Sequence, residues 1–163
     1  MSRHESMRGY FAYELLERAK KDKSIVVVTA DLGYGMWDQF RDELPNQFYN
    51  VGAAEQVGAG ICVGLALEGM KPFFYSITTF LLYRPFETIR NYIHHEQIPV
   101  RLIGGGRDDD YKHDGFSHDS SDIYGILDNL NINTLYPDTK EEVPDMVKLM
   151  VDNNKPFFIS LRR

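Results

Sequence analysis

The chain of 163 residues is long enough to form one domain with a hydrophobic core. Its 18 Lys and Arg against 24 Asp and Glu give a net charge of −6, which disfavours nucleic acid as a partner. The single cysteine, Cys62, excludes an internal disulfide. Residues 1–21 lack the apolar core of a signal peptide, and no stretch reaches the roughly 18 uninterrupted apolar residues of a membrane span. The sequence therefore predicts a soluble, cytoplasmic protein with no membrane or nucleic-acid partner.

Short apolar runs alternate with stretches of helical periodicity along the whole chain. The predicted helices span residues 7–21, 36–44, 54–68, 79–96, 121–129 and 140–152. The predicted strands span residues 25–28, 48–51, 73–77, 100–103, 134–136 and 157–161. This alternation predicts an α/β fold in a single domain, 1–163: a three-layer, mostly parallel sheet of about six strands with helices on both faces.

Two segments carry more specific predictions. Ile25–Val28 is β-branched throughout, which is typical of a strand covered on both faces. The polar segment 104–120 is predicted as a long loop, and Ser121 or Asp122 as the cap of the helix that follows it.

In parallel sheets, ligand-binding groups gather in the loops at the carboxyl ends of the strands. This rule selects residues 31–35, 52–56, 78–83 and 104–118, together with the residues after Leu161.

Self-sufficient catalytic signatures are absent from the sequence. There is no Walker-type phosphate loop and no nucleophile elbow, and Gly33-Tyr34-Gly35 lacks the third glycine of a dinucleotide fingerprint. A calcium loop started at Asp110 would place Ser121 where a bidentate glutamate is required. His94-His95 has no helical partner histidine and is expected to be a surface pair. No residue of this chain is assigned to a metal.

Glu55 is the main candidate for chemistry. It lies in Val51-Gly52-Ala53-Ala54-Glu55-Gln56, where a predicted strand ends and a helix begins. A structural alternative stays open, since an acidic residue in a first helical turn offsets the helix dipole by about 0.3–1 kcal/mol. The small residues behind Glu55 are equally consistent with close helix packing.

Four motifs in register resemble the pyrimidine-binding domain of transketolase over nearly the whole chain. They are Val51–Gln56 with the small-residue helix through Gly64–Gly69, then Lys71-Pro72-Phe73, then Thr79–Phe86, and finally Asp114-Gly115-Phe116-Ser117-His118. Similar domains occur in deoxyxylulose-phosphate synthase and in the β subunits of 2-oxoacid dehydrogenases. The resemblance implies a thiamine diphosphate-binding fold of the pyrimidine type.

The resemblance also implies a cofactor, thiamine diphosphate. The family glutamate matching Glu55 shares a proton with N1′ of the aminopyrimidine, so that the 4′ nitrogen takes the proton from C2 of the thiazolium. Tyr83 matches the residue that stacks on the aminopyrimidine, Phe80 and Phe86 match flanking walls, and Asp31 matches an aspartate lining the same cleft. The aromatic residues are also open to a purely structural role in the core.

Substrate contacts follow from the same resemblance. Asp114 and His118 match residues that hydrogen-bond the hydroxyls of the sugar, with His118 also assigned to the catalytic set. Arg162 matches an arginine that contacts the sugar phosphate. The alternatives left open are loop solvation and capping for Asp114 and His118, and a frayed terminus for Arg162.

Three departures from the family pattern shape the prediction of a partner. The G-D-G motif that holds the diphosphate and its metal is absent, and no third, C-terminal domain follows the last predicted strand. The loop before Asp114 diverges, with Gly106 where the family has a phosphate-binding histidine, so a non-phosphorylated substrate stays open. We therefore expect a partner subunit that carries the G-D-G motif and the Mg²⁺ or Ca²⁺, in an α2β2 heterotetramer with an exposed apolar surface on this chain.

The resulting hypothesis is a transketolase-like transferase, active only with its partner, that moves a two-carbon ketol unit between sugars or sugar phosphates. A 2-oxoacid dehydrogenase β-like subunit and a deoxyxylulose-phosphate synthase-like subunit are the alternatives within this class. The alternative from another class is a regulatory module that keeps the fold without the chemistry.

Overall fold

The computed structural model describes residues 5–163, which form one six-stranded sheet in the order β2-β1-β3-β4-β6-β5. All five neighbouring strand pairs are parallel. The strands are β1 (Ile25–Thr29), β2 (Phe48–Asn50), β3 (Lys71–Ile77), β4 (Arg101–Gly105), β5 (Asn133–Leu135) and β6 (Phe157–Leu161). The α-helices are α1 (Met7–Ala19), α2 (Asp38–Glu43), α3 (Glu55–Leu67), α4 (Thr78–Tyr83), α5 (Phe86–Thr88), α6 (Tyr124–Leu127) and α7 (Val143–Asp152). The predicted α/β class is confirmed, with a sheet that is parallel throughout.

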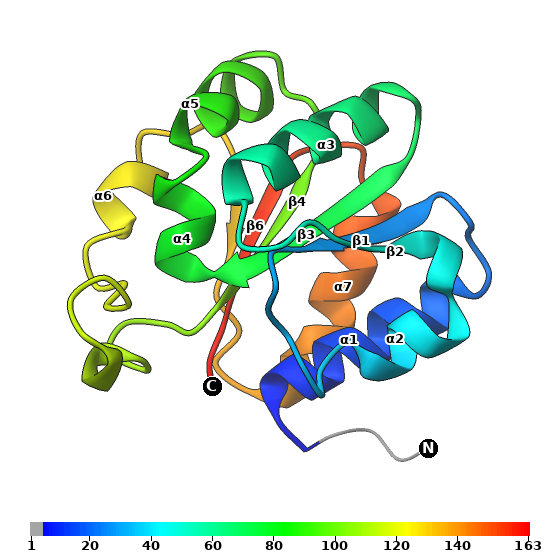
Figure 1. Ribbon diagram of the computed structural model, residues 1–163, viewed down its shortest axis with the longest axis horizontal. Coiled ribbons are helices and arrows are strands. Elements are labelled where there is room, and N and C mark those ends of the chain that lie inside the picture. The colour runs from blue at the N-terminus through cyan, green and yellow to red at the C-terminus, as the bar shows by residue number, and fades with distance from the viewer. Residues whose placement is uncertain (1–4) are drawn as a thin grey trace.

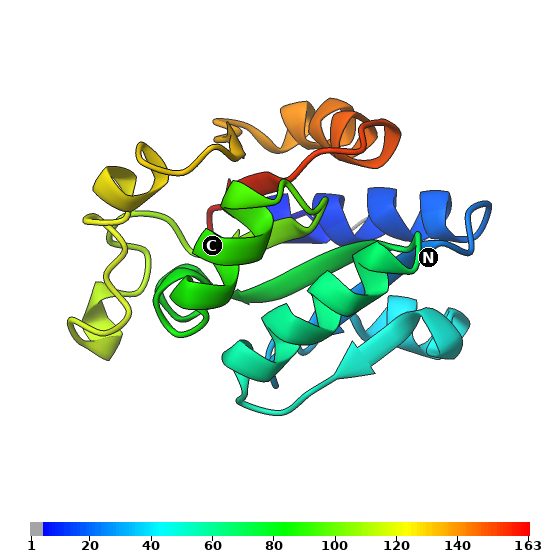
Figure 2. The same cartoon turned by 90° about the horizontal axis from the view of Figure 1, so that it is seen from above.

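The molecule has three layers. Helices α1, α2 and α7 lie on one side of the strands and α3, α4 and α5 on the other (Figure 1). Seen from above, the sheet runs from the cyan β2 at one edge toward the red β6 near the other (Figure 2). Each face of the sheet has its own hydrophobic cluster, so the four central strands β1, β3, β4 and β6 are buried from both sides, whereas the edge strands β2 and β5 are largely exposed.

Strand β1 contributes side chains to the hydrophobic clusters on both faces of the sheet. Ile25 and Val27 pack into the cluster under α1 and α7, whereas Val28 packs into the cluster under α3, and all three are fully buried. The alternation follows from the period of two in a strand. The prediction of a strand covered on both faces is therefore confirmed.

The predicted helix 79–96 is wrong as a single element. The chain forms α4, breaks at Pro85, resumes as the single turn α5 and continues as a π-helical segment over Ile89–His95. Proline has no backbone N–H and disrupts the preceding helical turn, which accounts for the break.

The helix predicted at 121–129 is shorter, and its predicted cap is wrong. Helix α6 begins at Tyr124, and its N-cap position, Ile123, makes no side-chain hydrogen bond. The Asp122 side chain instead lies near the Tyr83 hydroxyl, whose pKa is raised by desolvation and further by Asp122. The Ser121 backbone N–H donates to Asp119 Oδ1, and neither residue stands at the N-cap position of α6.

The strand order places a switch point between β1 and β3, where the chain connections turn in opposite directions. Ligands bind parallel α/β sheets outside the carboxyl ends of the strands at such a point. The loop after β2 and the first turn of α3 lie at this edge (Figure 1). Within residues 5–163, no helix has both the length and the apolarity needed to cross a bilayer.

Helix α3 packs closely on β3 through Gly58. A Cβ built on Gly58 would lie 2.6 Å from ring atoms of Phe74, which is fully buried, and 3.2 Å from Val51 Cγ2. The next glycine in the helix, Gly60, has no heavy atom within 4 Å of such a Cβ. Gly58 is therefore required by the packing of this domain, and Gly60 is not.

We predict opposite effects for the two alanine substitutions. Gly58→Ala is expected to lower the free energy of unfolding by about 1–3 kcal/mol because the buried Phe74 ring cannot move aside. The matched control Gly60→Ala is expected to raise it by about 0.5–1 kcal/mol through helix propensity. Urea unfolding of the two variants measures both changes. Equal effects would contradict the packing assigned to α3.

Candidate functional site

The Glu55 carboxylate is a buried negative charge at the carboxyl edge of the sheet. Glu55 is the first residue of α3, and its side chain is only 1% exposed. Its Oε1 accepts a hydrogen bond from Ser76 Oγ at 3.0 Å, and Ser76 is itself fully buried near the end of β3. The start of a helix is electrostatically favourable for such a charge. The sequence prediction that Glu55 begins a helix at the strand end is therefore confirmed.

Arg84 is the second partner of Glu55. Its Nη1 lies 2.9 Å from Oε1 and 2.8 Å from Oε2 of the carboxylate. The guanidinium carbon also lies 3.8 Å from the centre of the Phe80 ring. Phe80 lies within helix α4, and Arg84 directly follows the last residue of this helix. A planar, N–H-bearing group is thus held between an aromatic face and a buried carboxylate.

His118 also contacts the Phe80 ring. The two rings meet edge to face with centroids 4.8 Å apart. The loop carrying His118 is tied to α4, because Thr79 Oγ1 donates to the Ser117 carbonyl at 2.7 Å. The structure therefore brings three of the predicted site residues, Glu55, Phe80 and His118, into one connected set of contacts.

Tyr83 and Phe86 lie further out on the same segment. Both are partly exposed, Tyr83 by 41% and Phe86 by 37%. Desolvation raises the pKa of the Tyr83 hydroxyl to about 12, with a further contribution from its hydrogen bond to Asp122. The Tyr83 hydroxyl thus has an acidic neighbour, Asp122. The stacking role assigned to the two rings stays a prediction.

Asp31 lies in the loop after β1, in a left-handed conformation with φ of 54°. Its backbone N–H donates to Asn50 Oδ1, which also accepts from the Gly52 N–H, both at 3.0 Å. The Asp31 carboxylate accepts a hydrogen bond from the Tyr34 hydroxyl at 2.6 Å. Asn50 therefore joins the loop that holds Asp31 to the loop that leads into Glu55.

The predicted substrate residues divide between two places. Asp114 ends a 3-10 turn next to His113, and the turn that follows directly is closed by the His118 N–H, which donates to the Gly115 carbonyl, so Asp114 and His118 lie in two consecutive turns. Arg162 lies apart from this turn, with Nη2 3.2 Å from Asp108 Oδ2. Arg162 is thus held by a carboxylate in the structure, and its predicted contact with a sugar phosphate is untested.

The divergent acidic loop satisfies its charges internally. Asp108 Oδ1 accepts from the Tyr124 hydroxyl, and Asp110 Oδ2 accepts from the backbone N–H groups of Arg107 and Arg163. Arg107 is buried, and its Nη2 donates to the Pro137 and Ser160 carbonyls. Burial lowers the pKa of the Arg107 guanidinium. This loop is fixed against the ends of β4 and β6.

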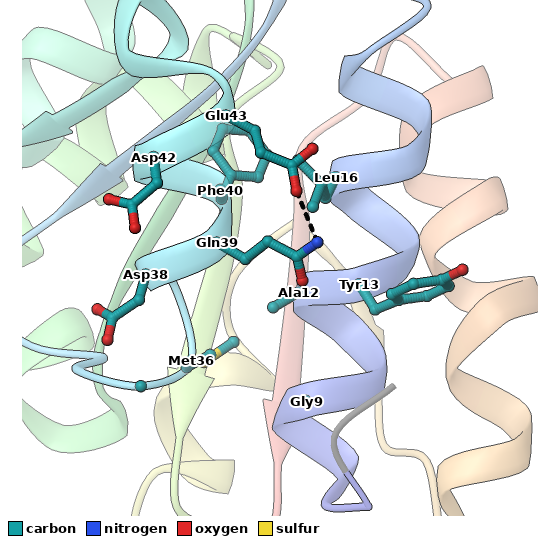
Figure 3. Close-up of a pocket in the computed structure, with 11 residues that line it drawn as sticks. Gly9, Ala12, Tyr13, Leu16, Met36, Asp38, Gln39, Phe40, Asp42 and Glu43 are labelled. Carbon is teal, nitrogen blue, oxygen red and sulfur yellow. Dashed lines mark hydrogen bonds between the residues drawn. The ribbon is translucent and has the colours of Figure 1, made fainter. Parts of the chain in front are cut away.

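Within the described part of the chain, no group of three or more His, Cys, Asp or Glu side chains is placed to hold a metal. A cavity of about 440 Å³ lies between α1 and α2, on the opposite face of the sheet from α3 (Figure 3). Its carboxylates are already paired, Asp38 and Asp42 with Arg41 and Glu43 with Lys20. The described residues that line this cavity include none of the predicted site residues.

The sequence analysis assigned no role to three residues of the site. Ser76 and Asn50 carry no motif, because a serine in a strand or an asparagine at its end is commonplace. Arg84 stood inside the motif Thr79–Phe86 without an assigned function. Its position directly after Tyr83 gives no signal that its partner lies 29 residues upstream.

The fold and the site together define an α/β domain with a buried acidic residue where a parallel sheet binds ligands. Residues 4–163 match the family described as "Transketolase, pyrimidine binding domain", and the chain belongs to this family. Its relatives place it in the thiamine diphosphate-dependent, transketolase-like class of proteins.

Three known proteins illustrate what this chain is similar to in sequence and structure. It is 33% identical to a protein of Phocaeicola vulgatus named as a subunit of apulose-4-phosphate transketolase, over 96% of this chain and 51% of that protein. It is 32% identical to a "1-deoxy-D-xylulose-5-phosphate synthase" of Clostridium perfringens, over 97% of this chain and 26% of that protein. A solved structure, "Split gene transketolase, inactive beta4 tetramer", superposes with a TM-score of 0.85 and 27% identity, over 97% of this chain and 51% of that one. The chain spans about half, or less, of these relatives.

The residues present fit the aminopyrimidine of thiamine diphosphate. The Arg84 guanidinium is planar and donates N–H groups, and it lies both on the Phe80 ring and on the Glu55 carboxylate. An aminopyrimidine needs the same two contacts, an aromatic face and a carboxylate aligned with a ring nitrogen.

We predict that Ser76→Ala destabilises the protein by about 1.5–3 kcal/mol, because the buried Glu55 carboxylate loses a hydrogen bond to a charged acceptor. The matched control is Ser160→Ala, a fully buried serine on β6 whose Oγ lies 3.4 Å from Arg107 Nε. The control substitution should lower the free energy of unfolding by only about 0.5 kcal/mol, because the hydrogen bond that it removes is long. Chemical denaturation compares the two variants, and equal losses would remove Ser76 from the support of Glu55.

Proposed function

We propose that this chain is the pyrimidine-domain subunit of a heteromeric thiamine diphosphate-dependent transketolase-like enzyme. The enzyme transfers a two-carbon ketol unit between sugars or sugar phosphates. The observation that carries the proposal is the buried Glu55 carboxylate at the carboxyl edge of the sheet, aligned with the Phe80 ring through one planar group.

Each protein group has a specific task in this proposal. Thiamine diphosphate, when bound, supplies the nucleophilic carbon that cleaves and re-forms the bond next to a ketose carbonyl. Glu55 shares a proton with N1′ of the aminopyrimidine, and the Ser76 hydroxyl fixes the orientation of its carboxylate. Phe80 provides one aromatic wall. Tyr83 stacks on the aminopyrimidine, Phe86 provides a second flanking wall, and Asp31 lines the cleft.

The turn of residues 114–118 is proposed to hold the substrate. His118 lies beside Phe80, and Asp114 directly precedes the turn that carries His118. Both side chains offer hydrogen-bonding groups to sugar hydroxyls, and His118 also exchanges a proton with the sugar. For a phosphorylated sugar, Arg162 would leave Asp108 to bind the phosphate.

A deoxyxylulose-phosphate synthase-like reaction is the second candidate, supported by the 32% identity to a protein of that name. The transketolase-like reaction is preferred because of the relative named as a transketolase subunit, which this chain matches over about half of that protein's length. The two reactions differ in their substrates, so product analysis distinguishes them.

We propose that the diphosphate and its Mg²⁺ or Ca²⁺ are held by a partner subunit with a G-D-G motif, in an α2β2 assembly. The outer face of α3 supports a contact with another subunit. Val57 is 55% exposed and Leu67 69% exposed on this helix, and Ile61 lies between them. A Cβ on Gly60 or Gly64 would meet open space, so these glycines have no packing role within the described domain. A glycine face lets a partner helix approach closely.

Calorimetry with thiamine diphosphate and magnesium tests the proposal directly. We expect no measurable binding by this chain alone and clear binding after mixing with the G-D-G chain encoded nearest to it. Glu55→Gln should assemble with the partner but lose at least about 100-fold in turnover, because proton sharing with the ring nitrogen is removed.

Glu87→Gln, an exposed position on α5, is the control for loss of a carboxylate and should leave turnover unchanged. Full turnover of the Glu55→Gln complex would contradict the catalytic role proposed for Glu55. A folded mixture that binds no cofactor would favour the regulatory module instead.

The glycine face of α3 gives a separate prediction. Gly60→Ala combined with Gly64→Ala should stabilise the isolated chain by about 1–2 kcal/mol, since each helical glycine costs about 0.5–1 kcal/mol. The same pair should weaken assembly with the partner, because two methyl groups fill the space of close approach. Thermal unfolding and analytical ultracentrifugation measure the two effects, and unchanged assembly would exclude α3 from the interface.

A further inference from the structure

Arg84 covers the Glu55 carboxylate on its solvent side. One nitrogen, Nη1, bridges both carboxylate oxygens at 2.9 and 2.8 Å, and Ser76 occupies a further position on Oε1. The Glu55 side chain is 1% exposed, whereas the Arg84 side chain is 45% exposed. A ligand nitrogen that reaches Glu55 from solvent must therefore take the place of Arg84, because Ser76 is fully buried.

The Arg84 guanidinium makes a second contact, with the Phe80 ring. Arg84 rests on the Phe80 ring at 3.8 Å, so it occupies the aromatic face as well as the carboxylate. A guanidinium is planar, permanently charged and able only to donate hydrogen bonds. It therefore uses the same wall and the same acceptor that the proposed function assigns to the aminopyrimidine.

We propose that Arg84 competes with the aminopyrimidine for Glu55 and Phe80, and that its departure is a required step of cofactor binding. This inference rests on the proposed function, since it assigns the competing ligand. Arg84 has a long, half-exposed side chain and can turn into solvent without disturbing the core. The apparent cofactor affinity is then reduced by the fraction of molecules in which Arg84 lies on Glu55.

The test is cofactor affinity in the assembled complex rather than activity. The Arg84→Met variant keeps most of the side-chain volume and removes the charge and the N–H donors. Its dissociation constant for thiamine diphosphate, measured by calorimetry with the G-D-G partner and magnesium, should be about three- to tenfold lower than that of the unchanged complex.

Three comparisons isolate the competition. In a Glu55→Gln background, Arg84→Met should leave the dissociation constant unchanged, because the carboxylate charge that holds Arg84 over Phe80 is gone. Arg90→Met is the matched control, an exposed arginine on the same segment whose Nη1 donates to Asn91, and it should have no effect. Arg84→Lys, which keeps the charge but cannot bridge and stack as a plane, should bind with intermediate affinity and replaces Arg84→Met if that variant unfolds.

The outcomes separate this inference from the proposed function. Binding that is weaker or unchanged in both Arg84 variants overturns the competition, since Arg84 would then support the cofactor or ignore it. If the unchanged complex and the Arg84 variants all fail to bind, the proposed function falls together with the inference. Tighter binding that persists in the Glu55→Gln background also overturns it, because the effect would not pass through Glu55.

Discussion

The rest of the site depends on compensating one buried negative charge, the Glu55 carboxylate. A carboxylate removed from water is costly unless it is paired and hydrogen-bonded. Three features supply this compensation: the start of α3, the Ser76 hydroxyl and the Arg84 guanidinium. The first two are built into the sheet and its covering helix, whereas Arg84 comes from the partly exposed end of α4. The charge is therefore held by two buried features and by one half-exposed side chain.

The parallel sheet explains why these groups meet. Ser76 lies near the carboxyl end of β3, Asn50 ends β2, and Glu55 begins the helix that connects these two strands. Parallel pairing places all these ends at one edge, next to the switch point between β1 and β3. Asn50 then joins two loops through its side-chain oxygen. The carboxyl edge of the sheet is thus assembled from the ends of several different segments of the chain.

The acidic loop before Asp114 is held in place by contacts with the ends of two strands and with α6. Asp108 and Asp110 are held by tyrosine and arginine groups from the ends of β4 and β6 and from α6. These contacts tie the loop to the ends of the two strands and to α6. The structure therefore accounts for the unusual sequence before Asp114 as a local support for the turn that carries His118. Arg162 takes part in this support, which ties any role in phosphate binding to the opening of its contact with Asp108.

The sequence by itself determined the fold class, the six strands and the placement of Glu55 at a strand-to-helix junction, because apolar periodicity and β-branched runs reflect local burial. It failed at Pro85, where a helical pattern continued through a residue that breaks helices, and at Asp122, which lies before the N-cap position of α6 and does not cap it. Only the tertiary structure decided the partners of Glu55. Ser76 and Arg84 are 21 and 29 residues away along the chain, and contacts at such separations follow from sheet order and helix packing, which no local pattern encodes.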